Sequence, residues 1–107
     1  MTRIKQSDVM APAMKLMAES WVRSLGYGRV RVARVYRLQR TRDGSGAEEY
    51  LLARGESGVE GPVSMLLKVE GTGYQMTFRV HKSAARKAEG KMINAWYDAE
   101  GALRDGL

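Results

Sequence analysis

The stretch RVRVARVYRLQ, residues 29–39, decides the predicted fold. Successive residues of a strand point to opposite faces, and valine and tyrosine favour strands. One face then holds Val30, Val32, Arg34, Tyr36 and Leu38, and the other holds Arg29, Arg31, Ala33, Val35, Arg37 and Gln39. Arg34 interrupts the apolar face. We expect either a β-bulge near Ala33 that turns Arg34 outward, or a guanidinium that reaches past the edge of the sheet.

Three more strands follow along the chain, each separated from the last by turn signals. They are predicted at residues 48–54, 62–70 and 74–80. Asp43-Gly44 is a strong hairpin signal, and the connections 55–61 and 71–73 are rich in glycine. In the last strand the alternation places Tyr74, Met76, Phe78 and Val80 inward. Short connections imply a four-stranded antiparallel meander.

A helix is predicted on each side of these strands. The first spans residues 8–25, where Met10, Met14, Met17, Trp21 and Leu25 recur at helical spacing. We expect Ser7 or Asp8 to cap it, Pro12 to lie in its first turn and Gly26 to end it.

The C-terminal segment favours a second helix, capped by Ser83, with Trp96 buried against the sheet. Its apolar stripe comprises Ala85, Ala88, Met92, Trp96, Ala99 and Leu103. Gly90 and Gly101 each cost about 1 kcal/mol in a helix relative to alanine. An alternative therefore ends the helix near Gly90 and makes the following residues, to Leu103, a hairpin. The predicted fold is α+β, a single domain over residues 1–107 in the order α-β-β-β-β-α, with both helices on one face of the sheet.

Composition points to an anionic partner. The 107 residues include no cysteine, which excludes disulfides and thiolate chemistry, and the net charge is +6. Ten basic and two acidic side chains fall within residues 1–42, so the charge is concentrated in the first part of the chain. Lys15 and Glu19 interrupt the apolar residues near the N-terminus, so we expect a cytoplasmic protein with no membrane partner.

No catalytic motif is present in the sequence. His81 is the only histidine, and the carboxylates form no acid–base pair. There is no phosphate-binding loop and no metal-ligand spacing. We therefore expect a non-enzymatic protein without metal or cofactor.

Basic residues form two groups that could bind anions. The first group lies on the predicted outer face of the sheet and comprises Arg29, Arg31, Arg37, Lys68 and Arg79. Arginine offers a planar fork of donors that fits phosphate or carboxylate. The second group lies at the start of the last helix and comprises Lys82, Arg86, Lys87 and Lys91, where free N–H groups would add to an anion site.

Two functions are compatible with these patterns. The first is binding to nucleic-acid phosphates, with DNA and RNA both open. The alternative is binding to a protein with an acidic surface, through Val35, Leu51 and Leu66 beside the arginines of the outer face. That alternative includes an adaptor, a self-associating homodimer, or an inhibitor of a host defence complex of the kind that phages and mobile elements encode.

Overall fold

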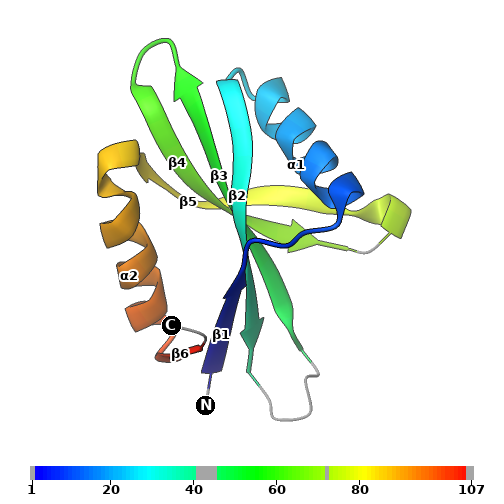
Figure 1. The fold of residues 1–107 in the computed structure, drawn as a ribbon, viewed down its shortest axis with the longest axis vertical. Coiled ribbons are helices and arrows are strands. Elements are labelled where there is room, and N and C mark those ends of the chain that lie inside the picture. Colours follow the sequence, from blue (N-terminus) through cyan, green and yellow to red (C-terminus); the bar gives the residue numbers. More distant parts are fainter. Residues whose placement is uncertain (1, 41–45, 72, 106–107) are drawn as a thin grey trace.

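The computed structural model describes residues 2–40, 46–71 and 73–105, and it contains a mixed arrangement of strands and helices (Figure 1). The strands are β1 (Thr2–Ser7), β2 (Gly28–Gln39), β3 (Glu48–Ser57), β4 (Gly61–Glu70), β5 (Thr77–Ala85) and β6 (Ala102–Asp105). The helices are α1 (Pro12–Ser24) and α2 (Glu89–Ala99), with short 3-10 helices η1 (Gly73–Gln75) and η2 (Arg86–Ala88). The predicted α+β class with an antiparallel sheet is confirmed.

The strands form one sheet in the order β5-β4-β3-β2-β1-β6. All neighbours are antiparallel except β1 and β6, which are parallel. The predicted order α-β-β-β-β-α, with four strands, is wrong because it lacks β1 and β6. Only Ile4 of β1 is fully buried, and β6 has four residues, so neither strand has an alternation long enough to detect.

Of the two explanations expected for Arg34, the structure confirms the β-bulge near Ala33. The pairing of β2 with β3 shifts register between Val32 and Arg34. Before the bulge, Val30 and Val32 pack on the α1 side of the sheet; after it, Tyr36 and Leu38 pack on the α2 side. Arg34 therefore lies exposed on the α2 side.

The bulge is held by a buried carboxylate. Glu19 of α1 is buried, and its Oε2 accepts a hydrogen bond from the N–H of Val32 at 3.0 Å. The carboxylate thus satisfies a backbone donor that a regular ladder would otherwise pair.

Two separate cores cover the two faces of the sheet. The core on the α1 side includes Ala18, Val22, Val30, Val32, Val35, Leu51, Ala53, Val63, Met65 and Leu67. The core on the α2 side includes Ile4, Tyr36, Leu38, Tyr50, Leu52, Leu66, Met92, Trp96 and Tyr97. The prediction that both helices cover one face is wrong. Consecutive apolar residues in β3 and β4 require burial on both faces, as in the central strands of a three-layer fold.

The predictions for the two ends of α1 are confirmed only in part. Pro12 lies in the first turn, and the chain leaves the helix through Gly26, whose φ is 101°. The predicted cap by Ser7 or Asp8 is wrong, because Ala11 occupies the N-cap without a side-chain hydrogen bond. Ser7 instead accepts a hydrogen bond from the N–H of Val9 at 3.0 Å.

The C-terminal segment is helical as far as Ala99, which excludes the hairpin alternative. The helix does not reach Leu103, because Gly101, with φ of 61°, turns the chain into β6. Ser83 lies in β5 and caps nothing. The predicted burial of Trp96 is confirmed, since its exposed fraction is 0%.

Two further predictions concern connections between strands. The Asp43-Gly44 hairpin signal lies outside the described residues. The predicted strand over residues 74–80 begins three residues too early: Tyr74 belongs to η1 and is fully exposed instead of facing inward.

Candidate anion-binding surface

The predicted arginine face does not exist as one surface. Arg31 lies opposite Arg54, which bonds to α2, so both belong to the α2 side of the sheet. Arg37 lies between Tyr36 and Leu38, which face α2, and so points to the α1 side. The bulge between Arg31 and Arg37 is what places them on opposite sides.

Several of the predicted cations are already paired within the molecule. The ion pairs are Arg29–Glu56 at 3.6 Å, Lys68–Glu48 at 3.7 Å, Arg79–Glu70 at 2.9 Å and Arg86–Glu89 at 3.7 Å. Exposed pairs of this kind contribute little stability, but they reduce the charge that an external anion would meet. No ion pair within the described residues involves the remaining members of the set, which are Arg31, Arg37, Lys82, Lys87 and Lys91.

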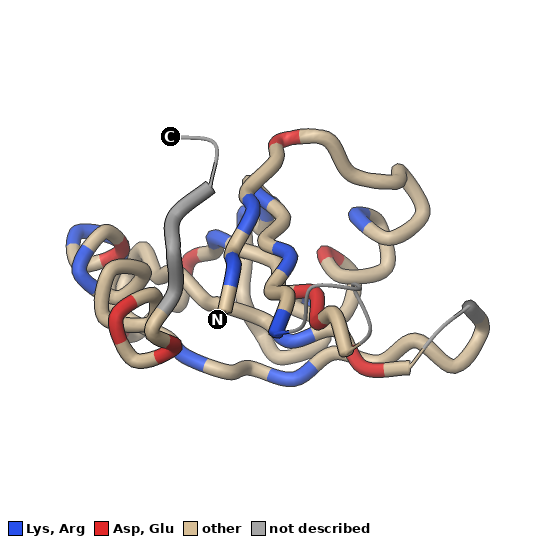
Figure 2. Tube along the Cα trace, turned by 90° about the horizontal axis from the view of Figure 1, so that it is seen from below, with Lys and Arg blue, Asp and Glu red and all other residues tan. Residues whose placement is uncertain are grey.

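Lysines come together where β5 leads into α2. A groove of about 450 Å³ lies between the end of β5 and one side of α2, and Lys82 and Lys91 both line it. The other lining residues are Ser83, Ala84, Ala88, Met92 and Ala95. Lys87 does not line the groove; it lies in η2, four residues before Lys91 of α2. Figure 2 shows several Lys and Arg positions at this junction with an acidic position among them, and further acidic positions toward the other end of α2. We refer to this groove, with Lys82, Lys87 and Lys91, as the basic groove.

Small side chains explain the shape of the basic groove. Ala84 on the strand and Ala88 and Ala95 on the helix side leave space between the two elements. Lys82 and Lys91 line the same groove, so an anion bound between them would reduce the repulsion between their charges.

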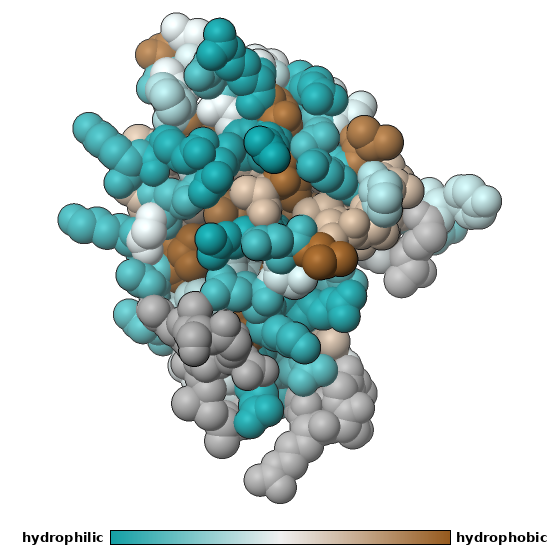
Figure 3. Space-filling model, viewed as in Figure 1, coloured by the Kyte–Doolittle hydropathy of each residue, from teal (hydrophilic) through white to brown (hydrophobic). Residues whose placement is uncertain are grey.

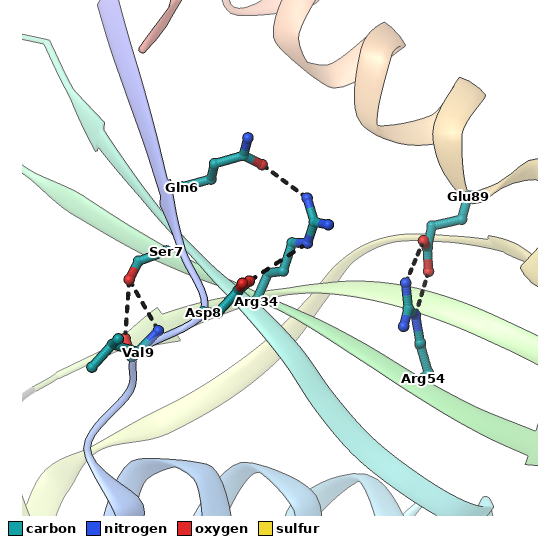
Figure 4. Close-up of polar contacts among 7 residues, drawn as sticks. All are labelled: Gln6, Ser7, Asp8, Val9, Arg34, Arg54 and Glu89. Carbon is teal, nitrogen blue, oxygen red and sulfur yellow. Dashed lines mark hydrogen bonds and ion pairs between the residues drawn. The ribbon is translucent and has the colours of Figure 1, made fainter. Parts of the chain in front are cut away.

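The start of α2 is anchored to the sheet by Glu89. Its carboxylate accepts hydrogen bonds from Nε and Nη2 of Arg54, both at 2.9 Å, and from the hydroxyl of Ser64 at 2.7 Å. Figure 4 shows the bidentate contact with Arg54. The hydrogen bonds from Arg54 lower the pKa of Glu89. The same carboxylate also lies 3.7 Å from Nε of Arg86, the cation that begins η2.

Sequence reasoning missed Arg54, although a signal was present. Arg54 and Ser64 are polar residues two positions from Leu52 and Leu66, which are buried on the same face of the sheet. Such positions inside a buried sheet require a polar partner from a packed element.

A second network anchors the far end of α2. Glu48 accepts hydrogen bonds from the hydroxyl of Tyr50 at 2.6 Å and from Arg40 at 3.0 Å, and Arg40 also contacts Glu100 at 3.0 Å. The hydrogen bond from Tyr50 lowers the pKa of Glu48. Lys68 also forms an ion pair with Glu48, so the charge of Lys68 is engaged within the molecule.

Arg34 has partners of its own on β1 and the loop that follows. Its Nη1 donates to Gln6 Oε1 at 3.1 Å, and its Nε lies 3.8 Å from Asp8 (Figure 4). It borders a smaller cleft of about 240 Å³ between α2 and β2. Its pairing makes it a weaker anion ligand than the lysines of the basic groove.

The predicted protein-binding patch is wrong. Val35 and Leu51 are buried in the core under α1, and Leu66 is buried in the core under α2. Their exposed fractions are 5% for Val35 and 0% for the other two. The outer face expected for them is covered, because each face of the sheet carries a helix.

Comparison of the chain with known protein families, characterised proteins and solved structures finds no match. Among the described residues, neither helix has the length and apolarity needed to cross a membrane.

Proposed function

We propose that the protein is a small, non-enzymatic binding module that holds nucleic-acid phosphates in the basic groove. The observation that carries this proposal is that Lys82 and Lys91 line one groove, with Lys87 nearby in η2, and that none of the three has an ion pair to any described residue. Arg86, which is only loosely paired with Glu89, adds a fourth cation beside them. Released counterions would supply most of the binding free energy.

The groove favours a duplex over a single strand. Proteins that bind single strands stack bases on exposed aromatic rings. None of the residues that line the basic groove is aromatic, and the floor consists of alanine and methionine side chains. Lysine acts as a point charge toward phosphate, so we expect binding to the backbone with little dependence on base sequence.

Salt titration tests this proposal. Fluorescence anisotropy of short labelled DNA and RNA duplexes is measured from about 50 mM to about 200 mM salt, and log affinity should fall linearly with log salt. Replacing Lys82, Lys87 and Lys91 together by alanine should make that slope shallower by about 3, one for each lost phosphate contact.

A matched triple variant controls for net charge. Arg3, Lys5 and Arg23 are exposed and lie away from the groove, so their joint replacement by alanine removes the same charge. This variant should change the slope by less than about 1. Equal losses in the two triple variants, or no binding to either duplex at about 50 mM salt, would contradict the proposal.

A further inference from the structure

The outer edge of β5 is unpaired in the described part of the chain. β5 is the last strand of the sheet on its side, and only β4 pairs with it. A free edge presents backbone N–H and C=O groups that can accept another strand. The opposite edge is formed by β6, which has only four residues. The nine residues of β5 are therefore the longer free edge of this sheet.

An apolar groove runs beside the start of β5. Its volume is about 550 Å³, and it lies between α1 and the segment that enters the strand. Its apolar lining consists of Leu16, Met17, Trp21, Met76 and Phe78. Leu16 and Met17 are 65% and 42% exposed, which is high for large apolar side chains. Figure 3 shows apolar atoms on the surface around α1, on the right of the view. We refer to this feature as the α1–β5 groove.

The two faces of β5 differ in chemistry. Phe78 and Val80 lie opposite Val69 and Leu67, and so belong to the α1 side. Arg79 lies opposite Lys68, on the α2 side. A strand added to β5 would therefore meet apolar side chains on one face and cations on the other.

Charge also argues against a second copy of β5 as the occupant. Arg79 and Lys82 are exposed on the strand, and antiparallel pairing of two copies would bring these like charges near one another. Charged residues on edge strands are a common protection against such self-pairing. Lys82 has no ion pair among the described residues and can attract an acidic strand, whereas Arg79 is held by Glu70 at 2.9 Å and would have to exchange that partner for the strand.

We propose that β5 and the α1–β5 groove bind an extended segment of a partner protein in which apolar and acidic residues alternate. The segment adds to the sheet through backbone hydrogen bonds, and its apolar residues enter the groove beside Met17 and Phe78. Its acidic residues lie beside Lys82 and Arg79, where they compete with Glu70 for Arg79. This mode of recognition takes affinity from the main chain and specificity from alternate side chains.

A peptide titration tests the proposal. The probe is a labelled peptide of alternating valine and glutamate, and binding is followed by fluorescence anisotropy. Met17→Ser should weaken binding by about tenfold through lost apolar contact. Arg79→Glu should weaken it by about fivefold, the size expected for one exposed ion pair. Val59→Ser, at a 95% exposed apolar residue in the β3–β4 turn, is the matched control and should leave binding unchanged.

Two altered peptides separate strand addition from charge attraction. A peptide of alternating valine and lysine should not bind. A valine–glutamate peptide methylated at alternate backbone nitrogens should lose most of its affinity, because it cannot complete the ladder.

Three results would overturn the proposal. They are absence of binding by the acidic peptide, equal binding by the methylated or basic peptide, and a protein dimer that Arg79→Glu disrupts. The last would assign the edge to a second copy of the chain. None of them depends on the lysine triple variant, so failure here is distinct from failure of phosphate binding in the basic groove.

Discussion

Glu89 joins three elements through one carboxylate, because it accepts hydrogen bonds from β3 and β4 while belonging to α2. Glu89→Gln should reduce the free energy of unfolding by about 1–3 kcal/mol, since it leaves donors of Arg54 and Ser64 without an ionised acceptor. Urea denaturation measures this loss. Asp98→Asn makes the same chemical change at an exposed position of α2 and should stay within about 0.5 kcal/mol. Equal effects at the two positions would contradict the role of Glu89.

His81 makes stability depend on pH in the mildly acidic range. Its ring centre lies 5.3 Å from that of Tyr50, and burial, followed by repulsion from Lys82 and Arg79, lowers the pKa of His81. A histidine whose folded pKa is depressed binds fewer protons in the folded state than in the unfolded state. Its contribution to stability is therefore present above the unfolded pKa of about 6.5 and is lost as pH falls toward the folded pKa.

His81→Gln should flatten this dependence. Unfolding by urea at about pH 8 and about pH 5 compares the two proteins around the histidine pKa. The native protein should lose more stability on acidification than the variant does. The same loss in both proteins would show that other groups cause the pH dependence.

Trp96 is the side chain through which α2 docks on the sheet. Its ring packs near Tyr36, Tyr50 and Tyr97, with centroid distances of 5.4, 5.0 and 5.6 Å. Within the described residues its buried Nε1 has no hydrogen-bond partner. Trp96→Ala should cost about 3–5 kcal/mol. Trp96→Phe should cost less, because phenylalanine keeps ring contacts and removes the unpaired donor.

Thermal or urea unfolding of the two Trp96 variants checks this ranking, with Lys87→Ala as an exposed control expected within about 0.5 kcal/mol. A thermally silent Trp96→Ala would mean that α2 does not depend on this side chain for its position.

The sequence predicts elements better than it predicts their arrangement. Alternation identifies β2, β3 and β4, and the 3.6-residue period identifies α1 and the helical part of the C-terminal segment. The prediction that both helices pack on one side of the sheet is wrong, because the bulge exchanges the faces of β2 along its length. The consecutive apolar residues Tyr50–Ala53 were the available sign that both faces are covered.

The candidate site was predictable only where its residues are close in sequence. Lys82, Lys87 and Lys91 fall within ten positions and share one junction of strand and helix. Arg29 and Arg79 were assigned to the same surface as free cations, but their partners Glu56 and Glu70 come from neighbouring strands. The register between neighbouring strands determines which charged side chains lie close enough to form an ion pair. That register cannot be read directly from the sequence.

On the scale of the whole molecule, two surfaces of different chemistry are separated by the sheet. The basic groove lies against α2 and the α1–β5 groove lies against α1. The net charge of +6 would draw anions to the molecule from a distance, but it does not specify where they bind. Placement comes from ion pairing and shape together: among the described residues Arg31 and Arg37 are also without an ion pair, but Lys82 and Lys91 line one groove and those two arginines lie outside it.

The most direct test of phosphate binding at this place is a map of backbone amide chemical shifts. Isotope-labelled protein is titrated with the DNA or RNA duplex that binds more tightly in the salt titration. The largest changes in chemical shift should fall on residues 82–91. Smaller changes should fall on Met92 and Ala95, which line the groove further along α2. The cations Arg3, Lys5 and Arg37 are exposed on the paired strands β1 and β2, and largest changes there would contradict the assignment of the basic groove. A spectrum that the duplex leaves unchanged would also contradict it.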